Sequence, residues 1–320
     1  MNLDWHADRS DLAELATLDQ LAVEEPIDLA AVRSYRLGRV REHCGPRAAV
    51  GVERANAGAA LALREEGFHL ADAQAPVERA RAVKSTEELK CVRASVRATE
   101  VAVARLRAAM RPGLTENELW SVLHQSVIAL GGDYVETRLL SSGSRTNPWF
   151  QETGDRRLAE DELVALDTDV VGCHGYYCDF SRTFHNGPGA PSRAQRELYQ
   201  VAYEQVHHNM ELLRAGTSFR DYSQQAWKIP ARFVANRYFV SAHGCGMTGE
   251  YPYLYHAMDF DESGYDGVIE PGMTLCVESY IGEEGGREGV KLEQQLLITE
   301  DGQELLSTFP FEPALLDEPA

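Results

Sequence analysis

Three things are scarce in this chain of 320 residues: positive charge, paired cysteines and long apolar runs. Lys and Arg number 31 against 50 Asp and Glu, for a net charge of −19. Such a surface repels nucleic acid and anionic membranes, so neither is expected as a partner. No apolar run approaches the length of a membrane span, and the acidic N-terminus does not resemble a signal peptide. Six cysteines without CxxC spacing are interpreted as reduced thiols, which predicts a cytoplasmic protein.

The remaining composition is that of a globular protein, with 44% hydrophobic residues and no repeat. Residues 1–82 are rich in Ala, Arg and Glu and contain no catalytic constellation. Residues 83–320 carry clearer patterns. Capping boxes and apolar spacing predict helices from Lys84 to Arg111 and from Thr115 to Leu130, and a long amphipathic helix over Pro191–Ala215. Strands and loops are predicted after residue 238, so the fold class is α+β.

The stretch Leu163–Phe184 places acidic residues inside an apolar pattern. It predicts two strands with a Gly-containing connection. Asp167 and Asp169 are two apart on the first strand and face one side, and Asp179 follows on the second. Buried carboxylates are costly unless a cation compensates them, which favours a metal site. A solvated edge strand, or a buried pair of Asp with Arg182, is the alternative that this stretch leaves open.

Three more potential ligands come from the later strands. His243 is followed by two glycines that let backbone approach an imidazole closely, and Glu278 and Glu293 each lie in an apolar strand. A lone histidine is more often a core residue, and a lone strand Glu usually faces water. Together, however, three Asp, one His and two Glu suit two divalent ions bridged by carboxylates.

Longer strings carry a family resemblance. The potential ligands follow the order Asp, Asp, His, Glu, Glu along the chain, and the strings around them are GYYCDFSRTF, HGCGM, IEPGMTLCVES and GVKLEQQLLIT. This order and these strings resemble the pita-bread metalloenzyme superfamily of methionine aminopeptidase, prolidase and creatinase. The resemblance implies two pseudo-symmetric halves that share a curved antiparallel sheet, with a catalytic domain at 83–320 after a shortened N-terminal region at 1–82. It assigns Asp179, His243, Glu278 and Glu293 as metal ligands.

The aspartate spacing narrows the resemblance. Superfamily peptidases usually place their first two Asp eleven residues apart, whereas Asp167 and Asp169 precede Asp179 by twelve and ten. This DTD variant resembles the dimethylsulfoniopropionate (DMSP) lyase branch. The upstream string ETRLLSSGSRTNPWFQE and the downstream string CVESYIGEEGGREGVKLEQQ carry the same resemblance. The resemblance implies that Asp167 and Asp169 both bind metal, commonly iron. Manganese, cobalt and zinc are alternatives, because occupancy also follows availability.

The lyase branch implies a small zwitterionic substrate, which is cleaved to dimethyl sulfide and acrylate by β-elimination. A sulfonium cation prefers aromatic rings, and core packing is the alternative for each candidate. The candidates are Trp149, Tyr238, Tyr251 and Tyr253. The reaction also needs a base at the α-carbon, and Glu250 or Tyr238 is the candidate.

Two departures keep other functions open. Superfamily peptidases have a catalytic His at the position of Glu250, and the lyase branch has an Asp at the position of Gly249. An X-Pro metallopeptidase (aminopeptidase or dipeptidase), which is a hydrolase, fits the same ligand set but lacks the His expected at position 250. Gly249 and the shortened N-terminal region leave open a metal-binding but catalytically silent relative. Relatives also carry a larger N-terminal domain that dimerises, so a homodimer is expected although this region is short here.

Overall fold

The computed structural model describes residues 41–43, 45, 47 and 49–316. Most of the N-terminal region therefore lies outside the described residues. The chain divides into two compact units, residues 1–75 and 76–320, and the domain limit between residues 82 and 83 stays a prediction. In the first unit the described part has two parallel strands, β1 (Ala49–Val52) and β2 (His69–Asp72), with helix α3 (Ala57–Glu65) between them.

The second unit contains the predicted helices. Helix α5 (Thr86–Ala109) begins with a capping box in which Ser85 Oγ accepts from the backbone N–H of Glu88 and the Glu88 carboxylate accepts from that of Ser85, at 3.3 and 2.7 Å. Equivalent boxes begin α6 and α7. The helices of the described chain after α3 are α4 (Gln74–Ala82), α5, α6 (Glu116–Ala129), α7 (Arg193–Leu212), α8 (Phe219–Gln225) and α9 (Phe260–Ser263).

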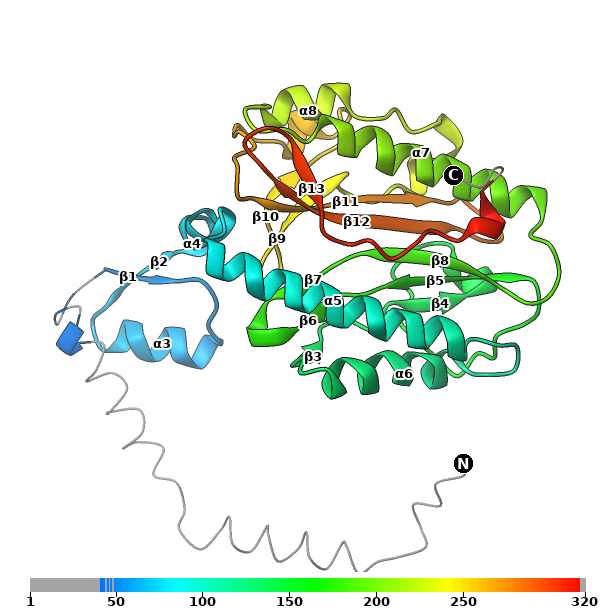
Figure 1. The fold of residues 1–320 in the computed structure, drawn as a ribbon. Helices are drawn as coiled ribbons and strands as arrows, with labels where there is room; N and C mark the ends of the chain where they lie inside the picture. The colour runs from blue at the N-terminus through cyan, green and yellow to red at the C-terminus, as the bar shows by residue number, and fades with distance from the viewer. Residues whose placement is uncertain (1–40, 44, 46, 48, 317–320) are drawn as a thin grey trace, which may run out of the picture. The chain divides into compact units, whose positions relative to one another are not determined.

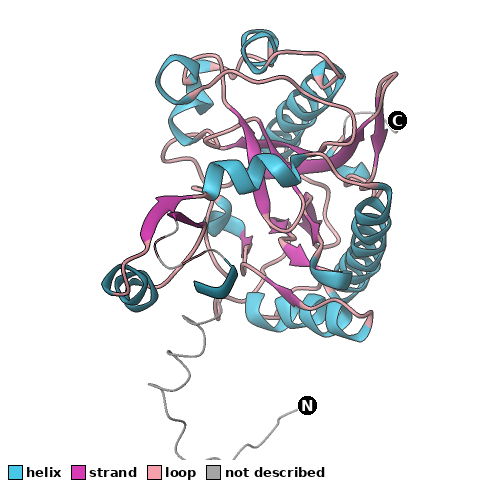
Figure 2. Ribbon diagram, turned by 90° about the vertical axis from the view of Figure 1, so that its left-hand side faces the viewer, coloured by secondary structure: helices cyan, strands magenta, loops and turns pink. Residues whose placement is uncertain are grey.

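Three antiparallel sheets lie between these helices (Figures 1 and 2). The largest has the order β10 (Gly249–Leu254), β9 (Ala242–Cys245), β11 (Thr274–Ile281), β12 (Val290–Ile298), β13 (Gln303–Leu305). The others have the orders β4 (Leu140–Ser142), β5 (Glu162–Asp167), β8 (Ser181–Asn186) and β3 (Tyr134–Val135), β6 (Val170–Val171), β7 (Tyr177–Cys178).

The two halves of this unit meet where β8 lies beside β12. The Thr183 hydroxyl donates to the Lys291 carbonyl at 2.9 Å and accepts from the Lys291 N–H at 3.1 Å. Helix α7 packs on β11 and β12, whereas α5 and α6 pack on the strands of the other half (Figure 1). The apolar core is accordingly divided between the two helix layers, and the strands between them hold the polar residues discussed below.

One predicted strand is divided in the structure. Strand β5 ends at Asp167, and Asp169 adopts a left-handed backbone conformation with φ of 40° before β6 begins in a different sheet. Asp is one of the few residues that tolerate this conformation. The prediction that one continuous strand aligns Asp167 and Asp169 is therefore wrong, because the chain turns between them.

None of the helices in the described part of the chain is long and apolar enough to cross a membrane.

We expect Ser85→Ala to lower the free energy of unfolding by about 1 kcal/mol, because it removes the acceptor for an N–H in the first turn of α5. Chemical denaturation measures the change. Ser121→Ala, an exposed position within α6, is the control and should change stability by less than about 0.5 kcal/mol. Equal effects of the two substitutions would contradict the capping role.

Candidate metal centre

The predicted ligands come together from separate strands. Asp167 ends β5, Asp179 lies between β7 and β8, and His243, Glu278 and Glu293 come from β9, β11 and β12. Glu278 is the direct cross-strand partner of Glu293. Antiparallel pairing therefore places two carboxylates side by side on one face.

His243 lies at the centre of this group. Its Nε2 is 3.3 Å from Glu293 Oε1 and 3.7 Å from both Asp179 Oδ2 and Glu278 Oε1. Asp179 Oδ1 and Glu278 Oε1 are buried and accept no hydrogen bond, and the contacts of Glu278 Oε2 and Glu293 Oε1 are ion pairs with Lys291 and His243. Buried carboxylate oxygens without donors are unfavourable. This donor set, of carboxylate oxygens and one imidazole nitrogen, fits a divalent ion.

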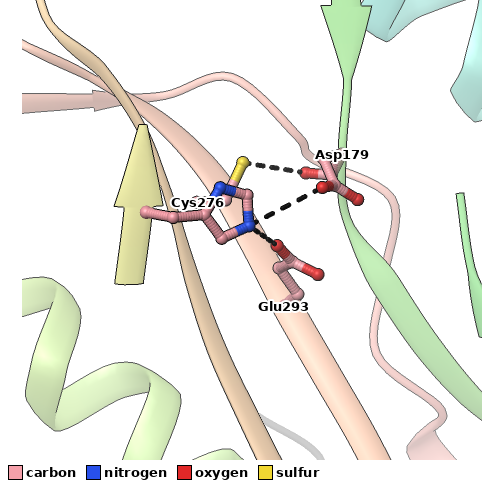
Figure 3. A group of neighbouring side chains, drawn as sticks. Asp179, Cys276 and Glu293 are labelled. Carbon is pink, nitrogen blue, oxygen red and sulfur yellow. Dashed lines mark hydrogen bonds and ion pairs between the residues drawn. The ribbon is translucent and has the colours of Figure 1, made fainter. Parts of the chain in front are cut away.

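Three residues that the sequence reasoning missed lie in the group, and the first is Cys276, whose sulfur is within 4.8 Å of ligand atoms of Asp179, His243 and Glu293 (Figure 3). Lys291 is completely buried, and its Nζ lies 2.8 Å from Glu293 Oε2, 3.0 Å from Glu278 Oε2 and 3.4 Å from Asp167 Oδ2. Ser181 Oγ lies 2.6 Å from Asp167 Oδ1 and 2.8 Å from Glu293 Oε2. Lys291 stands two residues before Glu293, so the period of the strand could have placed it on the same face.

Lys291 changes the charge balance of the site. Burial favours the neutral amine, but the charges of Asp167, Glu278 and Glu293 raise the pKa of Lys291 well above its usual value. One ammonium group then faces five carboxylates, with Asp169 included. Two divalent ions would supply the positive charge that is still missing.

The pKa values of the carboxyl groups depend on burial and on the charges beside them. Burial raises the pKa of Asp167, Asp169 and Asp179, and it raises that of Glu278 to about 7. Burial would also raise the pKa of Glu293, but Lys291 and His243 hold it below its usual value.

The pKa of the His243 imidazole is shifted by burial in the opposite direction to that of a carboxyl group. Burial would lower the pKa of His243, but Glu293 and Glu278 raise it to about 10. Without metal the imidazole is therefore a cation at neutral pH, and an incoming ion has to displace the proton on its Nε2.

Asp169 lies at the edge of the group. Its carboxylate accepts hydrogen bonds from the Tyr177 hydroxyl at 2.8 Å and from the Thr137 hydroxyl. Its charge raises the pKa of both Asp167 and Asp179. Asp169 is near enough to act on the site electrostatically, and its role as a ligand remains a prediction.

Arg182 does not pair with the aspartates. Its guanidinium donates to the carbonyls of Phe309, Ser181 and Glu293 and to the Gln294 side chain. The alternative of a buried Asp–Arg182 pair is therefore not what the structure shows.

The predicted aromatic residues fall into two places. The Trp149 and Tyr238 rings lie beside Lys291, with centroids 5.8 and 4.9 Å from its Nζ. Tyr251 instead packs against Phe219 and Tyr265, at 5.9 and 5.7 Å between ring centroids. Of these three residues, only Trp149 and Tyr238 face the carboxylate group. Burial and the charge of Glu278 raise the pKa of Tyr238 well above its usual value, which disfavours the phenolate that would act as base, and the role of Tyr238 stays a prediction.

The surroundings of Glu250 also argue against a role as base. Its buried carboxylate is paired with Lys84 Nζ at 2.9 Å and Arg81 Nε at 2.5 Å. A Cβ on the preceding residue, Gly249, would lie 3.5 Å from His243 Cε1. Successive strand residues point to opposite faces, so Glu250 points away from His243.

The fold and the gathered ligands define the class: a carboxylate-rich metalloenzyme fold of the pita-bread type, as the sequence predicted. Residues 90–300 match metallopeptidase family M24, and the chain belongs to this family. Its enzymes bind divalent metals.

Individual relatives agree with this assignment. The chain is 38% identical over 282 residues to dimethylsulfoniopropionate lyase DddP of Roseobacter denitrificans, a match that covers 87% of this chain and 63% of that protein. Among solved structures, it is similar to an Xaa-Pro dipeptidase from Bacillus anthracis, with 22% identity, TM-score 0.74 and coverage of 88% and 78% of the two chains. A dipeptidase from Pyrococcus horikoshii gives 19% identity, TM-score 0.75 and coverage of 88% and 77%.

We expect divalent ions to stabilise chelator-treated protein much more at pH 8 than at pH 5. At pH 5 the acids with raised pKa, such as Glu278 at about 7, hold protons that an ion must displace. Manganese or zinc at 100 times its dissociation constant at pH 8 should add about 2.7 kcal/mol, measured by denaturation.

Glu293→Gln should abolish this metal-dependent stabilisation, whereas exposed Glu300→Gln should retain it. Equal stabilisation at the two pH values, or in the two variants, would contradict a metal centre at this cluster.

We expect Glu250→Gln to lower the free energy of unfolding by about 3–5 kcal/mol, because it leaves the buried Lys84 ammonium without its carboxylate. The measurement is denaturation, followed by metal titration of the folded variant. Unchanged stability would contradict this ion-pair role, and loss of metal binding by the folded variant would place Glu250 in the metal centre.

Proposed function

We propose that the chain is a DMSP-lyase-like enzyme, which cleaves a carbon–sulfur bond by β-elimination. The observation that carries the proposal is the 38% identity to dimethylsulfoniopropionate lyase DddP, on a chain that gathers the expected carboxylates around His243. The chain spans 63% of the length of that relative, so the activity of the whole relative is transferred only as a proposal.

The reaction removes a proton from the α-carbon, forms a carbon–carbon double bond and breaks the bond from the β-carbon to sulfur, whose electron pair leaves with dimethyl sulfide. Bound divalent ions would act as Lewis acids toward the substrate carboxylate. The residues that would hold them are Asp167, Asp169, Asp179, His243, Glu278 and Glu293.

Other side chains would orient the substrate. The rings of Trp149 and Tyr238 already face one cation in the structure, which suits them to the sulfonium end.

We further propose two divalent ions, iron first and manganese, cobalt or zinc as alternatives, because two such charges complete the balance with Lys291. A cytoplasmic location is in keeping with the free thiols of Cys91, Cys173, Cys178, Cys245 and Cys276. The homodimer expected from the relatives is part of the same proposal.

The second candidate is an X-Pro metallopeptidase of the same fold. Membership of metallopeptidase family M24 supports it. It would use the same carboxylates and His243 to hold the ions, but hydrolyse a peptide bond instead of eliminating sulfur.

We expect iron- or manganese-loaded protein to release dimethyl sulfide and acrylate in equal amounts from DMSP. Gas chromatography measures the sulfide. Glu293→Gln should reduce release to the buffer rate, and Glu300→Gln should leave it unchanged.

Release of proline from Ala-Pro without any dimethyl sulfide would favour the peptidase instead. An inactive wild type with an active Gly249→Asp variant would identify a catalytically silent relative, since the new carboxylate would stand beside His243.

A further inference from the structure

The two strings ETRLLSSGSRTNPWFQE and CVESYIGEEGGREGVKLEQQ meet in the structure at one side-chain amide. Asn147 belongs to the first string, and the second contains β11 and the loop that leads to β12. The Asn147 Nδ2 donates to the carbonyls of Glu283 and Gly286 in this loop, at 2.7 and 2.9 Å. Its Oδ1 accepts from the Tyr280 hydroxyl at 2.8 Å and from Asn236 Nδ2 at 3.0 Å. The hydrogen-bonding capacity of this amide is therefore fully used.

The second string has glycines where this contact needs them. A Cβ on Gly282 would lie 2.5 Å from the Tyr280 hydroxyl and 2.7 Å from Asn147 Oδ1, and a Cβ on Gly289 would lie closer still to that hydroxyl. A side chain at either position would push Tyr280 and Asn147 apart. These two glycines therefore make room for the hydrogen bond between them.

Tyr280 connects the amide to the metal centre. Its side chain is buried, and its ring stacks on that of Trp149, with centroids 6.0 Å apart and an angle of 30° between the ring planes. On β11 it follows Glu278 by two residues, and it is the cross-strand partner of Lys291. Residues two apart on a strand face the same side, so the Tyr280 ring shares the face of the carboxylates. Asn147 thus fixes one end of Tyr280, and the other end supports Trp149.

The loop that carries Trp149 needs such support. The next residue, Phe150, has a φ of 71°, which bulky side chains rarely adopt. Contacts elsewhere in the loop have to hold the backbone in this conformation. Besides Asn147, Thr146 provides one, because its hydroxyl accepts from the Gly289 N–H at 2.9 Å.

We propose that Asn147 and Tyr280 are positioning residues, which hold the Trp149 indole where it meets the cationic end of the substrate. This inference rests on the proposed function, in which Trp149 faces the sulfonium. In this role neither residue contacts the substrate, and each acts through Trp149. A cation is attracted to an aromatic ring only when it lies over the face of the ring, so an indole that is free to tilt would bind it less well.

The chemistry of the reaction says which step depends on this positioning. The sulfur is positively charged in the bound substrate and loses its charge as the carbon–sulfur bond breaks. A ring that attracts the cation therefore favours the bound substrate over the transition state. Loosening the indole should weaken binding more than it slows bond breaking.

An unreactive analogue provides the test. 3-(Trimethylammonio)propanoate has the charges and nearly the shape of DMSP but a poor leaving group, and 4,4-dimethylpentanoate is its counterpart without the positive charge. Calorimetry on manganese-loaded, full-length protein measures the dissociation constants of both. Tyr280→Phe keeps the ring and removes the hydroxyl. We expect it to weaken binding of the cationic analogue about three- to tenfold, the size of one cation–π contact, and to leave binding of the other analogue unchanged.

The matched control is Tyr199→Phe. Tyr199 is also buried, and its hydroxyl accepts from the Glu312 N–H at 2.8 Å, away from Trp149. This variant loses a buried tyrosine hydroxyl as well, and it should leave both dissociation constants unchanged.

A double-mutant cycle shows whether Tyr280 acts through Trp149. In the Trp149→Phe background the indole is gone, so Tyr280→Phe should have no further effect on binding of the cationic analogue. A second measurement needs no ligand. In protein labelled with 5-fluorotryptophan, the fluorine resonance that Trp149→Phe removes should shift or broaden in Tyr280→Phe and in Asn147→Ala, but not in Tyr199→Phe.

The outcomes separate this inference from the proposed function. Equal effects of Tyr280→Phe in the two backgrounds, or on the two analogues, would overturn the positioning role, and so would an unchanged Trp149 resonance in Tyr280→Phe. The expected cycle in a wild type that releases no dimethyl sulfide would support the positioning role and count against the lyase. A metal-loaded wild type that binds neither analogue would overturn both proposals.

Discussion

The crowding of buried carboxylates around His243 and Lys291 is the constraint on which the rest of this structure depends. Like charges in a dry interior repel one another, and several of these oxygens have no hydrogen-bond donor. Lys291 and Ser181 relieve part of the repulsion through short contacts to Asp167 and Glu293. The negative charge that they leave uncompensated favours the binding of cations, and this is the physical basis of the proposed function.

The fold supplies the rigidity that such a cluster needs. Cross-strand pairing aligns Glu278 with Glu293 and Cys276 with His243, so the register of one sheet sets the positions of these four side chains. The bond between Thr183 and Lys291 joins this sheet to the half that carries Asp167 and Ser181. Arg182, buried beneath, binds backbone carbonyls of both halves. A small shift between the halves would therefore disturb the site directly.

The environment also separates residues that look equivalent in sequence. Asp167 contacts Ser181 and Lys291, whereas the oxygens of Asp169 are held by Tyr177 and Thr137. Gly249 stands beside His243, whereas the adjacent Glu250 is neutralised by Lys84 and Arg81 on the other face. Position along the chain predicts proximity, but hydrogen bonding and burial decide which groups remain available for chemistry.

Local signals in the sequence determined much of this protein. The capping boxes of Ser85 and Thr115 predicted where α5 and α6 begin, because they involve residues three apart. The motifs around Asp179, His243, Glu278 and Glu293 predicted the fold and the group that gathers.

Only the tertiary structure decided the turn at Asp169, the ion pairs of Glu250 and the entry of Lys291, Ser181 and Cys276 into the group. Several of these depend on contacts between residues more than a hundred positions apart, such as that of Ser181 with Glu293. The free energy of a buried charge is set by what surrounds it, and no stretch of sequence contains those surroundings.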